Sequence, residues 1–316
     1  MTSIPGHRPP VSPSIASRVW GSPYLLLTWT ALFWAGNSIV ARGARELVPP
    51  LALSFWRWAV ALLILLPIAW PHLRKDMPEL LRSWRMVALL GTLGIGAFNT
   101  LLYTGLQTTS AVNGLLLQSL QPGLILLLGS LLFAERTRAL QILGIVLSIA
   151  GALMIISKGE PTSLVALTIN GGDLVITCAV VVWSFYSVLL RKRPQVHPLS
   201  FLAATLAVGV VSVFPFYVVE MLSGRLIVAR TESWLAVGYV CVFPSLIAYL
   251  CYNRGVDLIG SAAAGLYLNI MPVMGALLAA LFLGEAIQLF HFAGVALVGT
   301  GIACAAIRSR SADQPA

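Results

Sequence analysis

The sequence predicts an all-α polytopic membrane protein, with ten transmembrane helices built as two inverted five-helix repeats. Of its 316 residues, 58% are hydrophobic and 10% are charged, with a mean hydropathy of +0.89, whereas soluble domains carry about 25% charged residues. Apolar runs of roughly 20 residues recur, each long enough to cross a hydrocarbon layer of about 30 Å as a helix. The landmarks of the first half of the chain return in the second half, 150 residues later.

Ten apolar runs are predicted to form the spanning helices. They cover residues 23–41, 50–70, 85–106, 110–133, 138–157, 171–190, 198–219, 233–253, 258–283 and 287–307. The first run is long and is followed by many further spans, so it is predicted to be a retained helix rather than a signal peptide. Because several connections are only a few residues long, neighbouring helices are predicted to form antiparallel hairpins.

The duplication divides the chain into two repeats with short tails. The predicted segments are an N-terminal tail (1–22), a first repeat (23–157), an inter-repeat loop (158–170), a second repeat (171–307) and a C-terminal tail (308–316). A shift of 150 residues places Gly105 on Gly255, Pro122 on Pro272, Glu135 on Glu285, Gly144 on Gly294 and Gly151 on Gly301. Since each repeat has an odd number of spans, the second copy enters the membrane the other way up. Such inverted repeats are typical of secondary transporters, whose substrate site lies near the midplane between the halves.

The basic residues predict the orientation. With a cytoplasmic N-terminus, 14 of the 20 lysines and arginines lie on the cytoplasmic side, five lie outside and Arg57 lies within a span. This bias follows the positive-inside rule, so both termini are predicted to be cytoplasmic, with the protein in the cell (inner) membrane. The same distribution accounts for the net charge of +9, and no nucleic-acid partner is predicted.

The sequence lacks a pattern for a metal, a cofactor or catalysis. The cysteines lie in apolar runs, without the spacing of a zinc site or a disulfide framework. They are Cys178, Cys241, Cys251 and Cys304. An intramembrane enzyme would need ionisable groups that converge at depth, but the four histidines lie in the tail, in loops or near a helix start. No cofactor and no enzymatic activity are therefore predicted.

Several short motifs occur in a fixed order in both halves. The first two spans contain LFWAGNSIVAR and FWRW, and each half has a proline followed by an acidic hairpin residue, in LLFAE ending at Glu135 and LFLGE ending at Glu285. Over nearly all of residues 23–307, this order resembles the EamA-type carriers of the drug/metabolite transporter superfamily. The resemblance implies a ten-helix carrier with a central cavity lined mainly by spans 1, 3, 4, 6, 8 and 9, which works by alternating access. It also implies export of small metabolites, and the bacterial aromatic amino-acid exporters are the group suggested.

Polar and aromatic residues on these spans are the candidates for substrate binding. They are Trp34, Asn37, Arg57, Asn99, Tyr103, Asn113, Gln118, Gln121, Trp183, Tyr186, Tyr249, Tyr267 and Asn269. A polar side chain in hydrocarbon is costly unless it has a partner, which favours a cavity lining; the alternative is packing and hydrogen bonding between helices. Several candidates correspond between the repeats: Trp34 with Trp183 at an offset of 149, and Asn99 with Tyr249 at 150.

Arg57 lies about 10 Å inside its predicted span, from seven residues at about 1.5 Å each. It can snorkel outward, bind a helix-end carbonyl, or hold a substrate carboxylate bidentately. Pro122 and Pro272 each remove a backbone donor and are either simple kinks or a pair of hinges. Glu135 and Glu285 are predicted to cap the helices that follow them, with a gating role as the alternative.

The predicted function is a secondary transporter that exports small metabolites, with amino acids, aromatic ones among them, as the first cargo. Its partners are a small-molecule substrate and the lipid bilayer. The first alternative is a carrier of the same fold for drugs or other metabolites; a membrane receptor and an intramembrane enzyme are distant alternatives. Because no Asp or Glu lies in the middle of a predicted span, transport is predicted to be facilitated diffusion, or to be coupled without a buried acid.

Overall fold

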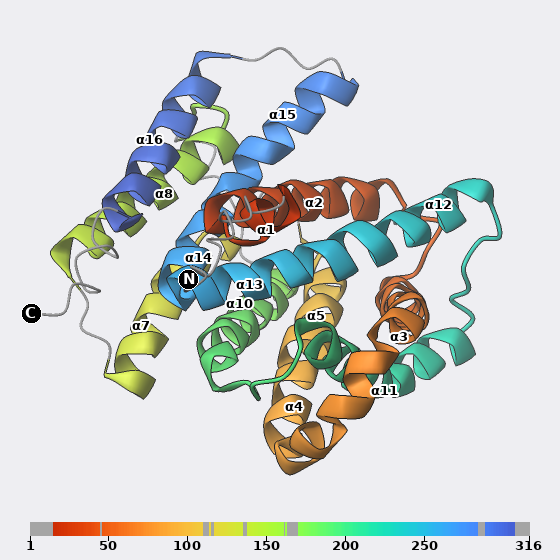
Figure 1. Cartoon of the computed structure of the whole chain (residues 1–316). Coiled ribbons are helices and arrows are strands. Elements are labelled where there is room, and N and C mark those ends of the chain that lie inside the picture. Colours follow the sequence, from red (N-terminus) through yellow and green to blue (C-terminus); the bar gives the residue numbers. More distant parts are fainter. Residues whose placement is uncertain are drawn as a thin grey trace, which may run out of the picture.

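The computed structural model describes residues 15–44, 46–109, 114, 117–134, 138–160, 162, 170–283 and 288–306. Every regular element in these ranges is helical (Figure 1). In chain order they are α1 (Ile15–Trp20), α2 (Pro23–Gly43), α3 (Pro50–Arg82), α4 (Trp84–Gly91), η1 (Thr92–Ala97), α5 (Phe98–Gly105), α7 (Gln121–Phe133), α8 (Ala139–Ile156), α10 (Gly171–Leu189), η2 (Leu190–Lys192), α11 (Pro198–Leu222), α12 (Thr231–Val240), η3 (Cys241–Ile247), α13 (Ala248–Ile259), α14 (Ser261–Tyr267), η4 (Leu268–Ile270), α15 (Met271–Leu283) and α16 (Leu289–Ala306).

Eight helical stretches of the described chain are long and apolar enough to cross a membrane. Two further predicted spans correspond to shorter apolar helices, Gln121–Phe133 and Leu289–Cys304. Two predicted boundaries are wrong. Helix α3 continues to Arg82 rather than ending near residue 70, and α13 ends at Ile259, because Gly260 adopts φ +83° and turns the chain into α14.

The helix pairs that pack across the two halves of the chain include α2 with α13, α5 with α10, α3 with α11, and α8 with α16. Figure 1 shows α8 and α16 side by side at one end of the molecule and α3 beside α11 at the other. A Cβ on Gly151 would lie 2.6 Å from the carbonyl oxygen of Gly294, and one on Gly301 would meet that of Gly144. The early part of α8 therefore lies against the late part of α16, so these two helices run antiparallel.

Helices α3 and α11 also run antiparallel. Glu220, near the end of α11, accepts a hydrogen bond from the backbone N–H of Ala52 at 2.7 Å, in the first turn of α3. His197, before α11, stacks on His72 of α3 with ring centroids 3.7 Å apart. The predicted span 198–219 ended one residue before Glu220, which belongs to α11. Its carboxylate is buried and accepts a hydrogen bond from the start of α3, where the first N–H groups of the helix have no partner within the helix.

Two π-helical turns interrupt the long helices that face the centre of the molecule. They are η1, between α4 and α5, and η3, between α12 and α13. Pro244 lies inside η3 and has no N–H to donate, while Gly94 in η1 lets the ring of Tyr186 approach to 2.5 Å of where a Cβ would stand. Such π-bulges leave backbone carbonyls free for other partners and are frequent at functional sites.

Candidate functional site

Aromatic rings from α2, α10 and α13 meet at the centre of the described structure. Trp34 lies edge to face against Trp183, with centroids 5.1 Å apart, and Tyr249 lies 5.7 Å from Trp34 and 5.9 Å from Trp183. Trp183 and Tyr249 are both about 1% exposed. Edge-to-face aromatic contacts add about 0.5–1.5 kcal/mol each beyond the area that they bury. These packed rings form the centre of the site, and the polar side chains of the site bond to them or lie beside them.

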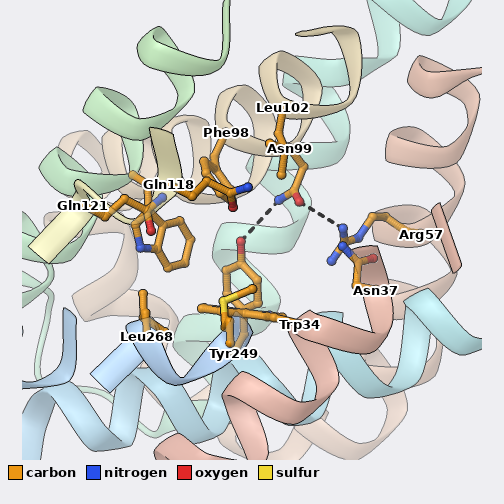
Figure 2. A pocket seen from close by; sticks show the side chains of 12 residues that line it. Trp34, Asn37, Arg57, Phe98, Asn99, Leu102, Gln118, Gln121, Tyr249 and Leu268 are labelled. Carbon is orange, nitrogen blue, oxygen red and sulfur yellow. Dashed lines mark hydrogen bonds between the residues drawn. The ribbon is translucent and has the colours of Figure 1, made fainter. Parts of the chain in front are cut away.

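A central cavity lies beside these rings (Figure 2). Its lining residues are Trp34, Asn37, Arg57, Phe98, Asn99, Leu102, Gln118, Gln121, Trp183, Tyr249, Leu268 and Met271. The cavity volume is about 30 Å³, which is room for about two waters, since one needs at least 10–15 Å³ on this measure. An amino acid is larger than this space. The described side chains leave too little room for such cargo, which would need the lining elements to separate.

Arg57 of α3 is 1% exposed and lies inside the protein. Its Nε donates to Ser245 Oγ at 2.9 Å, and its Nη1 donates to Asn99 Oδ1 at 3.0 Å and to the Tyr103 hydroxyl at 2.5 Å. The guanidinium also lies 4.2 Å from the ring centroid of Trp58, which is a cation–π contact. Snorkelling and a helix-end carbonyl are both wrong for this side chain, because its hydrogen bonds go to neutral side chains at depth.

A chain of hydrogen bonds ties Arg57 to the surrounding helices. Tyr103 donates to Asn37 Oδ1 at 3.0 Å, and Asn99 makes a long bond of 3.4 Å to the Tyr249 hydroxyl (Figure 2). Tyr249 in turn donates to the carbonyl of Gly94 at 2.5 Å, and Trp34 Nε1 donates to that of Pro244 at 3.0 Å. The two π-turns thus supply the carbonyls that orient the rings of the cavity.

The second half contains a related pair outside the cavity lining. Tyr186 donates to Asn253 Oδ1 at 2.8 Å, and these positions correspond to Asn37 and Tyr103 at offsets of 149 and 150. The phenol and the amide have exchanged helices, yet the hydrogen bond between them is kept in both halves.

Eight predicted site residues line the cavity: Trp34, Asn37, Arg57, Asn99, Gln118, Gln121, Trp183 and Tyr249. Tyr103 does not line the cavity, but its hydroxyl accepts a hydrogen bond from the lining residue Arg57. Tyr186 is buried and donates to Asn253. Tyr267 bonds to the Thr28 hydroxyl at 2.9 Å, and Asn269 is buried with no partner for Nδ2 among the described residues. Asn113 lies outside the described residues, as do Glu135 and Glu285.

The predicted hinges begin helices in this structure. Pro122 and Pro272 each occupy the second position of a helix, α7 and α15. A proline is well tolerated there, because the N–H that it lacks would have no partner in the first turn. The helical path is irregular just before each proline, at a turn over residues 119–120 and at the 3₁₀ turn η4. Both breaks lie next to lining residues, Gln121 and Met271.

The apolar part of the lining was not predicted from the sequence; it consists of Phe98, Leu102, Leu268 and Met271. In a chain this apolar, an apolar residue of the lining cannot be told from one that faces lipid or another helix. The repeat could nevertheless have identified two of them, since Leu268 and Met271 correspond to the predicted site residues Gln118 and Gln121 at an offset of 150.

A family model, described as the EamA-like transporter family, matches the chain twice, over residues 21–157 and 170–307. The chain belongs to the EamA-like transporter family. The predicted resemblance to EamA-type carriers is thereby confirmed, while the narrower resemblance to aromatic amino-acid exporters is not. Trp34 and Trp183 each lie 13 residues after the start of a match.

Similar proteins agree with this assignment. The chain is 29% identical to the "Uncharacterized transporter YyaM" of Bacillus subtilis, over 88% of this chain and 92% of that one. It is 27% identical to the "Uncharacterized inner membrane transporter YedA" of Escherichia coli K12, over 84% and 85%. A solved structure described as "Crystal structure of protein" shares the fold, with a TM-score of 0.72 and 20% identity, over 92% of this chain and 99% of that one. This EamA-family protein is thus a multi-pass membrane transporter.

Proposed function

We propose that this EamA-family protein is a secondary transporter that exports small metabolites, with amino acids as the first cargo and aromatic ones among them, by alternating access around the central cavity. The observation that carries the proposal is the pairing of lining positions across the two halves. Four pairs line the cavity together: Trp34 with Trp183, Asn99 with Tyr249, Gln118 with Leu268, and Gln121 with Met271. A ligand there touches both halves at once, so rocking one half against the other would expose it to each side in turn.

Inverted repeats are supported by the direction of corresponding helices. Helices α3 and α11 occupy corresponding places in the two halves, as do α8 and α16, and each pair runs antiparallel. The cross-contacts also correspond: Gly105 packs on Ile176, and Gly255 packs on Leu27, 149 residues before Ile176. Two copies of one unit whose matching helices run oppositely are related by a two-fold axis in the membrane plane.

The proposed topology has ten spans in two repeats, 23–157 and 171–307, joined by the loop 158–170. The tails 1–22 and 308–316 are placed in the cytoplasm by the excess of lysine and arginine on that side. In this arrangement Pro122 and Pro272 are symmetry-related hinges, each at a break next to the cavity. The proposed membrane is the inner membrane, which is where the name of the Escherichia coli relative places that protein.

The two walls of the cavity differ in polarity, which bears on the cargo. The first half supplies Arg57, and its Asn99, Gln118 and Gln121 match the Tyr249 ring, Leu268 and Met271 of the second half. An amphipathic molecule suits such a lining, with its polar end toward Arg57 of α3 and Asn99 of α5. A cationic drug fits less well, because Arg57 brings a positive charge to the lining.

Efflux from proteoliposomes tests the function directly. Purified protein in liposomes loaded with a panel of labelled amino acids should release at least one of them faster than protein-free liposomes. A Gln118→Leu/Gln121→Met variant, which copies the second half onto the first, should lose that release while still assembling. If no amino acid moves, the amino-acid cargo is wrong; if the double variant transports like the wild type, this lining is not the site.

A further inference from the structure

We infer that Arg57 is a carboxylate-binding subsite of the central cavity, and that a bound carboxylate is required for the cavity to close, so that the carrier exchanges one carboxylate for another. The inference rests on the proposed function, because it specifies the cargo and the transport mode of that same site. It replaces simple facilitated diffusion, in which the unloaded carrier returns as readily as the loaded one.

The first observation is that the charge of Arg57 has no counter-charge in the described protein. Its three hydrogen bonds go to neutral oxygens, on Ser245, Asn99 and Tyr103. None of the described acidic residues forms an ion pair with Arg57; they are Glu46, Asp76, Glu79, Glu160, Asp173, Glu220, Glu232 and Asp257. Asp257 pairs with Arg193. A buried charge without a paired charge is costly, and inside a membrane protein it marks a functional site by default.

The second observation is the part of the guanidinium left for a ligand. Nε and Nη1 are engaged and one face lies against Trp58, whereas Nη2 donates to none of the described residues. Arg57 is also a lining residue of the cavity. A guanidinium with a free N–H edge facing a cavity suits a carboxylate, which it recognises through planar, charge-assisted hydrogen bonds.

The third observation is a surplus of donors at the cavity. Gln121 Nε2 and Trp183 Nε1 are buried without an acceptor among the described residues, although both side chains line the cavity and are at most 5% exposed. Figure 2 places Gln121 at the opposite end of the cavity from Arg57, so the shortage of acceptors extends along the site. Donors left in this state favour a ligand rich in acceptor oxygens.

These observations connect the ligand to the conformational change. In the described conformation about 30 Å³ remains beside Arg57, so packing the lining this tightly without a ligand strips the guanidinium of water and offers no anion in return. A carboxylate cargo supplies that anion when the lining closes around it, in a state roomier than the described one, and binds that state better than the open one, which shifts the equilibrium toward closure. The loaded carrier then crosses between its two open states faster than the unloaded one, and transport becomes exchange.

Thermal stability of the purified protein tests the subsite. Hydrocinnamate and hydrocinnamamide have the same size and differ in the carboxylate alone. At about ten times its Kd, hydrocinnamate should raise the Tm of the wild type by about 2–4 °C, while the amide should not. Arg57→Gln should abolish the shift, and Arg193→Gln, an arginine paired with Asp257 away from the cavity, should keep it. Arg57→Lys keeps the charge and is the variant to test if Arg57→Gln does not fold. Hydrocinnamate should raise the Tm of Arg57→Lys by less than that of the wild type.

Counterflow tests the exchange. Proteoliposomes filled with phenylalanine should take up labelled external phenylalanine about tenfold faster than those filled with buffer or with phenylalaninamide, which lacks the carboxylate. In Arg57→Gln the rate should no longer depend on the contents. Equal uptake into phenylalanine-filled and buffer-filled liposomes by the wild type overturns the exchange, and equal stabilisation by acid and amide overturns the subsite. If no amino acid moves while hydrocinnamate still stabilises the wild type and not Arg57→Gln, amino-acid export fails and the carboxylate subsite stands.

Discussion

Trp34 and Trp183 each lie 13 residues after the start of a family match, and their rings meet edge to face with centroids 5.1 Å apart. Residues that correspond across a duplication touch each other when they lie close to the axis that relates the copies. The contact therefore locates the junction of the two halves at the cavity that both indoles line. The two rings differ in one respect: Trp34 Nε1 donates to Pro244, whereas Trp183 Nε1 has no acceptor among the described residues.

This difference predicts opposite results for one substitution made in each half. Trp183→Phe removes a buried donor that has no acceptor, so stability should stay within about 1 kcal/mol of the wild type, since the lost ring area is offset by a polar group no longer buried alone. If the indole N–H serves the cargo, efflux should fall. Trp34→Phe should lower stability further, by about 1 kcal/mol for its lost hydrogen bond. Melting curves and efflux rates of both variants check this; a Trp183→Phe variant with full efflux would make that indole a packing residue.

The exchanged phenol–amide pairs provide a second matched comparison. Tyr103→Phe removes the hydroxyl between Arg57 and Asn37, leaving a buried charge with one acceptor fewer, and should cost about 1–3 kcal/mol. Tyr186→Phe breaks the corresponding bond to Asn253, outside the cavity lining, and should cost about 1 kcal/mol. We expect the first variant to change the KM for efflux and the second to leave it unaltered. The same change in KM for both would place the effect in the fold rather than in the site.

The repeat identified Trp34 with Trp183 and Asn99 with Tyr249 as corresponding positions and candidate lining residues. That the members of each pair touch was not predicted, and it places both pairs close to the axis that relates the two halves. The partners of Arg57 were not predictable, since a sequence gives the depth of a residue in its span and not its neighbours on other helices. The π-turns could not be predicted from the sequence either, because they depend on contacts between helices, such as that of Gly94 with Tyr186.

Stability should depend on pH through His197, in the loop before α11. Partial burial and the neighbouring charge of His72 lower the pKa of His197, although Asp76 opposes the shift. A folded-state pKa below the unfolded value near 6.5 means that the unfolded chain binds more protons. Stability should therefore fall as the pH drops through about 6.5, where protonation also removes the bond from the Leu199 N–H to Nδ1. His197→Asn keeps a capping acceptor and should flatten the dependence of Tm on pH over this range. An unchanged slope in that variant would assign the dependence to other groups.

The contact between α8 and α16 offers a test of packing that is independent of the cavity. Gly151→Ala places a Cβ 2.6 Å from the Gly294 carbonyl oxygen and 2.8 Å from a backbone nitrogen, that of Val298, so the two helices must separate. Close backbone approach at small residues is what holds membrane helices together, and we expect a loss of about 1–3 kcal/mol, the usual cost of forcing extra atoms into a packed contact. Gly299→Ala is the matched control on α16, because nothing lies within 4 Å of its Cβ, and it should be neutral or stabilising by about 0.5–1 kcal/mol through the better helix propensity of alanine. Unfolding of both variants in detergent would compare them, and equal stability of the two would contradict the antiparallel glycine contact on which the proposed inversion of the repeats depends.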